Sequence, residues 1–179
     1  MRKPNIAVLG ATGVVGREIL KILVENNVPY NEIKFLASAK SAGKKIEFKG
    51  EEHTIIEATP ESFEGVNIVL ASAGGSTSLK LAPEAVKRGC VFIDNSSAYR
   101  MDKDCPLVIV GVNDNDLKNH KGIIPNPNCS TSQLMLVLKP LHDYAKIKRM
   151  IVSTYQAVSG AGIAAINELK ENTVAVNEG

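Results

Sequence analysis

A glycine-rich turn directly after a short apolar run is the feature that most restricts what this chain can fold into. The stretch NIAVLGATGVVG places Gly10, Gly13 and Gly16 between an expected strand at 5–10 and an expected helix at 14–27. Glycines in such a turn let backbone N–H groups approach a pyrophosphate and let the helix pack closely on the strand. The N-terminus of the helix adds partial positive charge for the phosphates. The turn therefore predicts a dinucleotide-binding βαβ unit, with a plain tight turn as the alternative.

The following residues repeat this alternation of apolar strands and helices. We expect further strands at 33–38, 66–72, 90–96 and 107–113, a hairpin at 44–58 turning at Lys49 and Gly50, a helix at 79–89 interrupted at Pro83, and a short helical turn at 116–122. This order is typical of the α/β class, with a Rossmann-like, doubly wound parallel sheet. The expected domain therefore occupies residues 1–128.

The last part of the chain has a different pattern. We expect a helix from Cys129 to about Tyr144, disturbed by Pro140, then a long strand over 149–162, and residues 164–179 show no obvious terminating element. Residues 129–179 thus form the first part of a second, mixed α/β domain. A strand at 149–162 without sheet partners would drive self-association.

Composition excludes several classes of protein. The net charge is only +2 with both signs interspersed, and aromatic residues make up 4%, which argues against nucleic-acid binding. We find no signal peptide and no apolar stretch long enough to span a membrane. The three cysteines lack the spacing of metal ligands, so we expect free thiols, no metal and a cytoplasmic location.

The end of the second expected strand bears on the cofactor. A site for NAD usually has Asp or Glu there, to bind the ribose 2′-hydroxyl. This chain instead has Ser38, Lys40 and Ser41, whose hydroxyls and cation would accept a 2′-phosphate. The sequence therefore favours NADP over NAD, and a solvated loop is the alternative.

Polar turns follow two more of the expected parallel strands. SAGGSTS (72–78) and DNSSAYR (94–100) would lie beside the cofactor, because ligands gather at the carboxyl ends of such strands. Ordinary helix capping by the serines is an equal alternative. Arg100 differs from them, since a planar cation suits a phosphate or a carboxylate.

Cys129 lies between a proline-broken turn and the start of a helix, in PNPNCSTSQ. Ser130 and Gln133 match a capping box, so the helix should begin within a residue of Cys129. A thiol at that position is favoured as the nucleophilic thiolate. Beside a dinucleotide, it suggests a thiolate that adds to an aldehyde, loses hydride to NADP and leaves a thioester. Cys90 and Cys105 are expected to be inert.

Five motifs together resemble one enzyme family over the whole chain. GATGVVG, LASAKSAG, DNSSAYRM, PNPNCSTSQ and STYQAVSGAG, in this order and spacing, are similar to those of bacterial aspartate-β-semialdehyde dehydrogenase. The resemblance implies a phosphate-dependent enzyme that uses NADP and forms a homodimer. It would interconvert L-aspartyl-4-phosphate and aspartate 4-semialdehyde on the route to lysine, threonine and methionine.

The resemblance also implies roles for individual residues. Cys129 would be the acyl-thioester nucleophile, Gln156 would contact substrate, and Arg100 would bind phosphate. Together with the residues expected from the glycine turn and from the end of the second strand, the residues that bind the cofactor would be Gly10, Thr12, Gly13, Val14, Val15, Ser38, Lys40, Ser41, Ser159 and Gly160.

One departure limits what the resemblance implies. The family's general-base histidine and its carboxylate-binding arginine lie in the second domain, beyond the residues present, and His53, His120 and His142 are poor substitutes. We therefore expect little or no turnover by the chain alone. The alternatives are N-acetyl-γ-glutamyl-phosphate reductase, with the same thiol chemistry, and a non-catalytic NADP-binding fragment.

Overall fold

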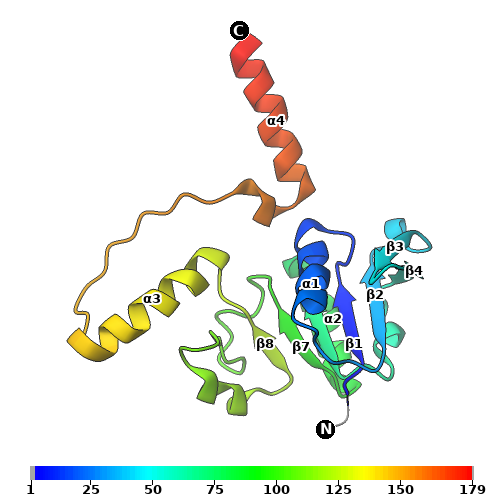
Figure 1. Cartoon of the computed structure of the whole chain (residues 1–179), viewed down its shortest axis with the longest axis horizontal. Coiled ribbons are helices and arrows are strands. Elements are labelled where there is room, and N and C mark those ends of the chain that lie inside the picture. Colours follow the sequence, from blue (N-terminus) through cyan, green and yellow to red (C-terminus); the bar gives the residue numbers. More distant parts are fainter. Residues whose placement is uncertain (1–2, 179) are drawn as a thin grey trace.

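The computed structural model describes residues 3–178, and its centre is a six-stranded parallel sheet (Figure 1). Every neighbouring pair of strands is parallel. In spatial order the strands are β5 (Ile56–Glu57), β2 (Ile33–Ala37), β1 (Ile6–Leu9), β6 (Ile68–Ala71), β7 (Val91–Asp94) and β8 (Ile123–Pro125). The order reverses between β1 and β6, so the sheet is doubly wound, as the sequence predicted.

The two faces of the sheet are covered by α1 (Val14–Glu25) and α2 (Gly75–Lys87). Alternate residues of β1 point to opposite faces, as the period of a strand requires. Ile6 and Val8 belong to the buried cluster that contains Leu20 of α1. Leu9 belongs to the other cluster, which contains Leu81 of α2. Burial on both faces explains why the strands read as continuous apolar runs.

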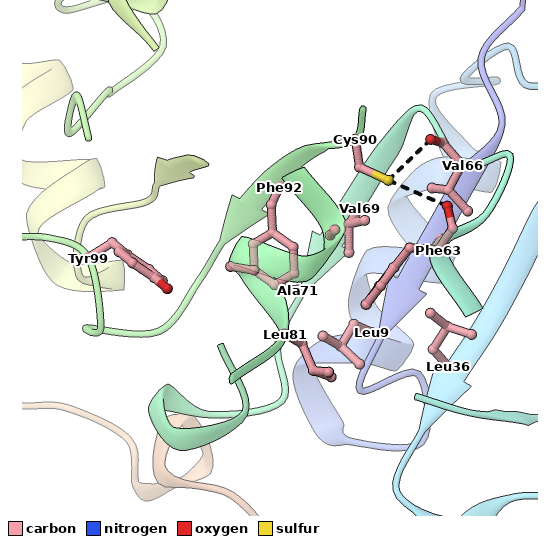
Figure 2. Close-up of a cluster of buried hydrophobic side chains, with 13 residues drawn as sticks. Leu9, Leu36, Phe63, Val66, Val69, Ala71, Leu81, Cys90, Phe92 and Tyr99 are labelled. Atoms are coloured by element: carbon pink, nitrogen blue, oxygen red, sulfur yellow. Dashed lines mark hydrogen bonds between the residues drawn. The ribbon is translucent and has the colours of Figure 1, made fainter. Parts of the chain in front are cut away.

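The cluster under α2 contains two of the largest fully buried side chains of the described residues (Figure 2). Phe63, at the end of the 3-10 helix η2 (Pro60–Phe63), and Phe92 of β7 are fully buried there. The Cys90 thiol lies among them and donates to the carbonyl oxygen of Val66 at 3.2 Å. Burial raises the pKa of this thiol. Cys90 therefore packs as a small apolar side chain, in agreement with its expected inertness.

The hairpin expected at 44–58 is present with its turn at the expected residues, but it is shorter, because Ile56 and Glu57 instead form β5 of the parallel sheet. β3 (Lys45–Phe48) and β4 (Glu51–Thr54) pair antiparallel. Lys49 and Gly50 both have positive φ, 54° and 79°, which is the geometry of a tight two-residue hairpin turn. The helix expected at 79–89 begins earlier, at Gly75, and runs through Pro83 without a break. The turn expected at 116–122 is the 3-10 helix η3 (Asp114–Asn119).

The strand expected at 107–113 is wrong, and β8 takes the sixth place in the sheet. The Asn113 side chain accepts from the N–H of Ile109 at 2.8 Å and donates to the carbonyl of Leu107 at 3.0 Å. These bonds curl the segment, and Gly111 turns it with φ +83°. The side chain of Val110 is consequently 75% exposed.

The last third of the chain leaves the sheet. It consists of α3 (Cys129–Ala145), an irregular segment over 146–157, the 3-10 helix η4 (Val158–Ala161) and α4 (Ile163–Glu178). The helix from Cys129 is confirmed, but the strand expected at 149–162 is wrong, because no described strand lies beside it to pair with. α4 is a helix that the sequence did not predict, and it projects away from the sheet (Figure 1). No helix in residues 3–178 combines the length and apolarity needed to cross a membrane.

Candidate active site

A cleft of about 740 Å³ opens at the point where the strand order reverses. The turn after β1 forms one wall, with Gly10 and Gly13, and the turn after β6 forms another, with Ser72 and Gly74. Doubly wound sheets bind their ligands at this position, because the two turns separate there. The N-terminus of α1 lines the cleft through Val14 and Val15. Its free N–H groups would face an anion bound there.

Two glycines make this cradle sterically feasible. Gly10 has φ +86°, and a Cβ on it would lie 2.9 Å from the backbone carbonyl of Ser72. A Cβ on Gly16 would lie only 2.1 Å from the carbonyl oxygen of Gly10. The turn and α1 therefore pack backbone against backbone. Together with the N–H groups of α1, this geometry fits the pyrophosphate of a dinucleotide.

The cleft brings together most of the residues expected to bind the cofactor. Its lining includes Gly10, Thr12, Gly13, Val14, Val15, Ser38, Ser159 and Gly160. Lys40 and Ser41 are outside that lining, in the 3-10 helix η1 (Ala39–Ser41) just beyond Ser38. Sequence reasoning missed two charged residues of the lining, Lys80 of α2 and Glu57 of β5. The sequence did not indicate Glu57 because its strand, β5, has only two residues. In the fold Glu57 pairs with Ala37 at the end of β2 and so reaches the cleft.

A second cleft, of about 690 Å³, adjoins the first and contains the expected catalytic residues. Cys129, Gln156 and Arg100 all line it. Val15, Gly160 and Ala161 line both clefts, so a ligand in the first would reach the mouth of the second. The turn DNSSAYR thus contributes to the second cleft, through Asn95 and Arg100, whereas SAGGSTS contributes to the first.

Cys129 is the first residue of α3, and its side chain is exposed. The Nε2 atom of Gln156 lies 3.7 Å from its Sγ atom. The expected capping box is wrong, because Asn128 caps the helix instead. Its Oδ1 accepts from the N–H of Ser130 at 3.1 Å and from Gln156 Nε2 at 3.0 Å. A single asparagine oxygen therefore fixes both the start of α3 and the side chain that approaches the sulfur.

Three asparagines of this site were not singled out from the sequence. Asn128 could have been found, because asparagine directly before an apolar helix is a preferred N-cap. Asn95 and Asn126 lie 31 positions apart and meet only in the fold, where Nδ2 of Asn126 donates to Oδ1 of Asn95 at 2.7 Å. No local pattern could have predicted that pair.

The other cysteines and the histidines lie away from the two clefts. Burial and the nearby carboxylate of Asp102 raise the pKa of the half-buried Cys105. His53 packs on the Phe35 ring at 4.9 Å, and His120 accepts from the N–H of Gly122. His142 lies thirteen residues along α3 from Cys129, about 20 Å at helical rise. Among residues 3–178 no group of His, Cys, Asp and Glu side chains is arranged to hold a metal ion.

Two family descriptions match the chain. "Semialdehyde dehydrogenase, NAD binding domain" matches residues 5–120, which include every strand of the six-stranded sheet except β8. "Semialdehyde dehydrogenase, dimerisation domain" matches residues 138–179. The residues between the two matches include Cys129 and the turn over 126–128, all of which line the second cleft.

Curated relatives and solved structures that resemble this chain are named aspartate-semialdehyde dehydrogenase. Aspartate-semialdehyde dehydrogenases from Bacillus subtilis and Aquifex aeolicus are each 55% identical, over 172 and 178 residues, and cover 96% and 98% of this chain but 50% and 52% of their own lengths. The crystal structure of aspartate semialdehyde dehydrogenase II from Vibrio cholerae, complexed with ASA, is 42% identical, with a TM-score of 0.92 over 99% of this chain and 54% of that one. The Candida albicans enzyme with NADP is 27% identical, with a TM-score of 0.67 over 80% of this chain and 48% of that one. The chain thus spans about half the length of the curated relatives it matches.

Proposed function

The chain belongs to the semialdehyde dehydrogenase family, and we propose that it contains the cofactor site and the nucleophile of an NADP- and phosphate-dependent aspartate-semialdehyde dehydrogenase. The main observation is the position of the Cys129 thiol, in a cleft that shares three lining residues with the dinucleotide cleft. In this proposal residues 1–128 form the NADP-binding domain, and residues 129–179 begin the catalytic and dimerisation domain. Residues 1, 2 and 179 lie outside the described structure.

The cofactor residues act by position and charge. Gly10, Thr12 and Gly13 would hold the diphosphate against the N-terminus of α1, and Ser159 and Gly160 would contact the nicotinamide. Ser38 with Lys40 and Ser41 next to it would bind the 2′-phosphate of NADP. Bound NADP supplies a two-electron acceptor for hydride.

The thiolate form of Cys129 performs the covalent step. Its sulfur adds to the aldehyde carbon, and the carbonyl π electrons move to the oxygen, where the N–H groups at the start of α3 would stabilise the oxyanion. The C=O double bond then re-forms from this oxyanion as hydride leaves the carbon for the two-electron acceptor, so a thioester remains on Sγ. Gln156 Nε2, 3.7 Å from the sulfur, would orient the acyl group.

Phosphate completes the reaction. A phosphate oxygen attacks the thioester carbon, the carbon–sulfur bond breaks, and L-aspartyl-4-phosphate leaves with thiolate restored. Arg100, in the wall of the same cleft, would hold this phosphate. The same steps in reverse order reduce the acyl phosphate to the semialdehyde, the direction used in the synthesis of lysine, threonine and methionine.

No described histidine lines either cleft, so the family's general base has no counterpart there. Arg100 is the only described arginine that lines either cleft, and it is already assigned to phosphate, so the arginine for the substrate carboxylate has no counterpart either. We therefore propose that the 179-residue polypeptide alone turns over slowly or not at all. Robust activity of that polypeptide, abolished by Cys129→Ala, would contradict this part of the proposal.

The test is semialdehyde oxidation by the protein at its native length, with phosphate and with NADP or NAD. Cys129→Ala should reduce turnover at least about a thousandfold, as loss of a covalent nucleophile does. Cys105→Ala is the matched control and should have wild-type activity. NADP should be preferred. Faster reduction of N-acetylglutamyl phosphate than of aspartyl phosphate would favour the sister reductase. NADP binding without turnover, unchanged in Cys129→Ser, would favour the non-catalytic alternative.

A second copy of the chain is the proposed partner. The α3–α4 region exposes large apolar side chains, among them Leu141, Ile151, Leu169 and Val176, and the dimerisation description matches residues 138–179, which contain these four. Exposed apolar surface of this kind marks interaction sites. Light scattering on the 179-residue chain should show self-association, and a monomer of 19.2 kDa at high concentration would contradict it.

A further inference from the structure

The guanidinium of Arg100 is largely occupied by the protein's own backbone. Its Nε donates to the carbonyl of Asn126 at 2.8 Å, and its Nη2 donates to the carbonyls of Asn95 at 3.0 Å and Pro127 at 3.4 Å. A guanidinium has five N–H donors in a rigid fork, so three of them are used here. Two of the three acceptors belong to the turn directly before Asn128 and Cys129.

The loop that contains Arg100 is itself fixed to the sheet. Asp94 at the end of β7 is fully buried, and its carboxylate accepts from the hydroxyls of Ser78 and Ser96, each at 2.7 Å. The carbonyl of Asp94 also accepts from the N–H of Asn126 at 2.7 Å. Arg100 therefore joins the turn before Cys129 to a loop that Asp94 anchors in the core.

Arg100 lines the catalytic cleft and still has donors that the protein does not use. Arg100 is half-buried in the cleft wall, and its Nη1 has no hydrogen bond to any residue in the described range 3–178. Two donors thus remain for an oxyanion. One rigid group would then hold the nucleophile's turn with one edge and bind an anion with the other.

We propose that Arg100 is a positioning residue for Cys129, in addition to its proposed contact with phosphate. Its three bonds to main-chain carbonyls keep the turn before Asn128 in place, and so keep the N–H groups of the first turn of α3 beneath the sulfur. The proposal deepens the proposed function. Lysine is not equivalent here, because a single ammonium group cannot reach the three carbonyls in the same geometry.

The first test needs no enzymatic activity. Alkylation of Cys129 by iodoacetamide is followed by mass spectrometry in the 179-residue chain, without phosphate. Arg100→Lys should slow alkylation roughly tenfold, the factor expected for losing a charge-assisted hydrogen bond at the turn. Arg88→Lys is the matched control, because Arg88 is also half-buried but binds Glu84 on α2. It should leave the rate unchanged.

The second test separates positioning from simple phosphate binding at native length. A single turnover of hydride transfer, measured before phosphate is added, should be slowed about tenfold by Arg100→Lys, and saturating phosphate should not restore kcat. If Arg100 only binds phosphate, alkylation and this turnover keep wild-type rates and only the KM for phosphate rises, which would overturn the proposal. If the wild-type protein transfers no hydride, the proposed function fails, while the alkylation test still decides on positioning.

Labelling of Cys90 reports whether the fold is intact, because this thiol is buried. It should stay unlabelled in Arg100→Lys. If that variant does not fold, Arg100→Gln takes its place, because the shorter side-chain amide cannot reach all three carbonyls, and alkylation of Cys129 should again be slowed roughly tenfold. An unchanged rate in a folded variant would contradict the positioning role.

Discussion

The first two thirds of the chain and the last third use similar apolar residues with opposite results. In the first two thirds, Phe35 and Phe92 of the sheet and Phe63 of η2 are almost completely excluded from solvent. In α3 no residue is buried. Tyr144 near its end is 93% exposed, and Tyr155 in the irregular segment after it is 104% exposed. The difference lies in the available partners, since β1 pairs with β2 and β6, whereas residues 3–178 contain no second layer that covers α3 and α4. Apolar composition therefore specifies a fold only where the chain also supplies the surface to be covered.

The largest expected difference concerns matched aromatic truncations. Phe63→Ala should destabilise the chain by about 4 kcal/mol, because it removes a fully buried ring and leaves a cavity. Tyr155→Ala should change the free energy of unfolding by less than about 0.5 kcal/mol. Urea denaturation at one protein concentration measures both. Equal effects would show that the last third is packed in solution as tightly as the sheet.

A methyl group added to one glycine of each region gives the next comparison. Gly16→Ala should destabilise by about 3 kcal/mol, because its Cβ would lie 2.1 Å from the Gly10 carbonyl oxygen. Gly160 has open space around the position of a Cβ, so Gly160→Ala should be nearly neutral in the same denaturation experiment. A tolerated Gly16→Ala would mean that α1 does not pack closely on the glycine turn.

The cap of α3 tests the start of the less buried region. Asn128→Ala removes the acceptor for the Ser130 N–H, and should destabilise α3 by about 1 kcal/mol. Hydrogen exchange should then become faster in the first turn of α3 and remain unchanged in β1 and β6. Gln133→Ala, one turn later, is the control. Faster exchange throughout the sheet would show that the two regions unfold together.

The smallest effect is a pH dependence within α3. The hydrogen bond and the charge of Lys139 lower the pKa of Asp143 below its ordinary value of 3.8. A lowered pKa means that the pair stabilises the helix above pH 3.8, and that this contribution is lost as pH falls below it. The helical circular dichroism signal should show a small loss over that range, which Lys139→Gln abolishes. An unchanged titration in Lys139→Gln would show that the pair has no effect.

Sequence reasoning worked where a feature depends on neighbouring residues. The glycine turn, the hairpin at Lys49 and Gly50, and the helix starting at Cys129 are all local, and the structure confirms them. The segment 107–113 was wrong because the side chain of Asn113 satisfies its backbone in place of a neighbouring strand. The Asn95–Asn126 pair and the anchoring of Arg100 depend on contacts across the fold, which no local pattern contains.

The most direct test is the intact mass of the native-length protein after incubation with aspartate semialdehyde and NADP, without phosphate. We predict a gain of one aspartyl group, located on Cys129 by peptide mapping and removed when inorganic phosphate is added. Turnover without such an adduct, or an adduct located on Cys105 instead, would contradict the role of Cys129.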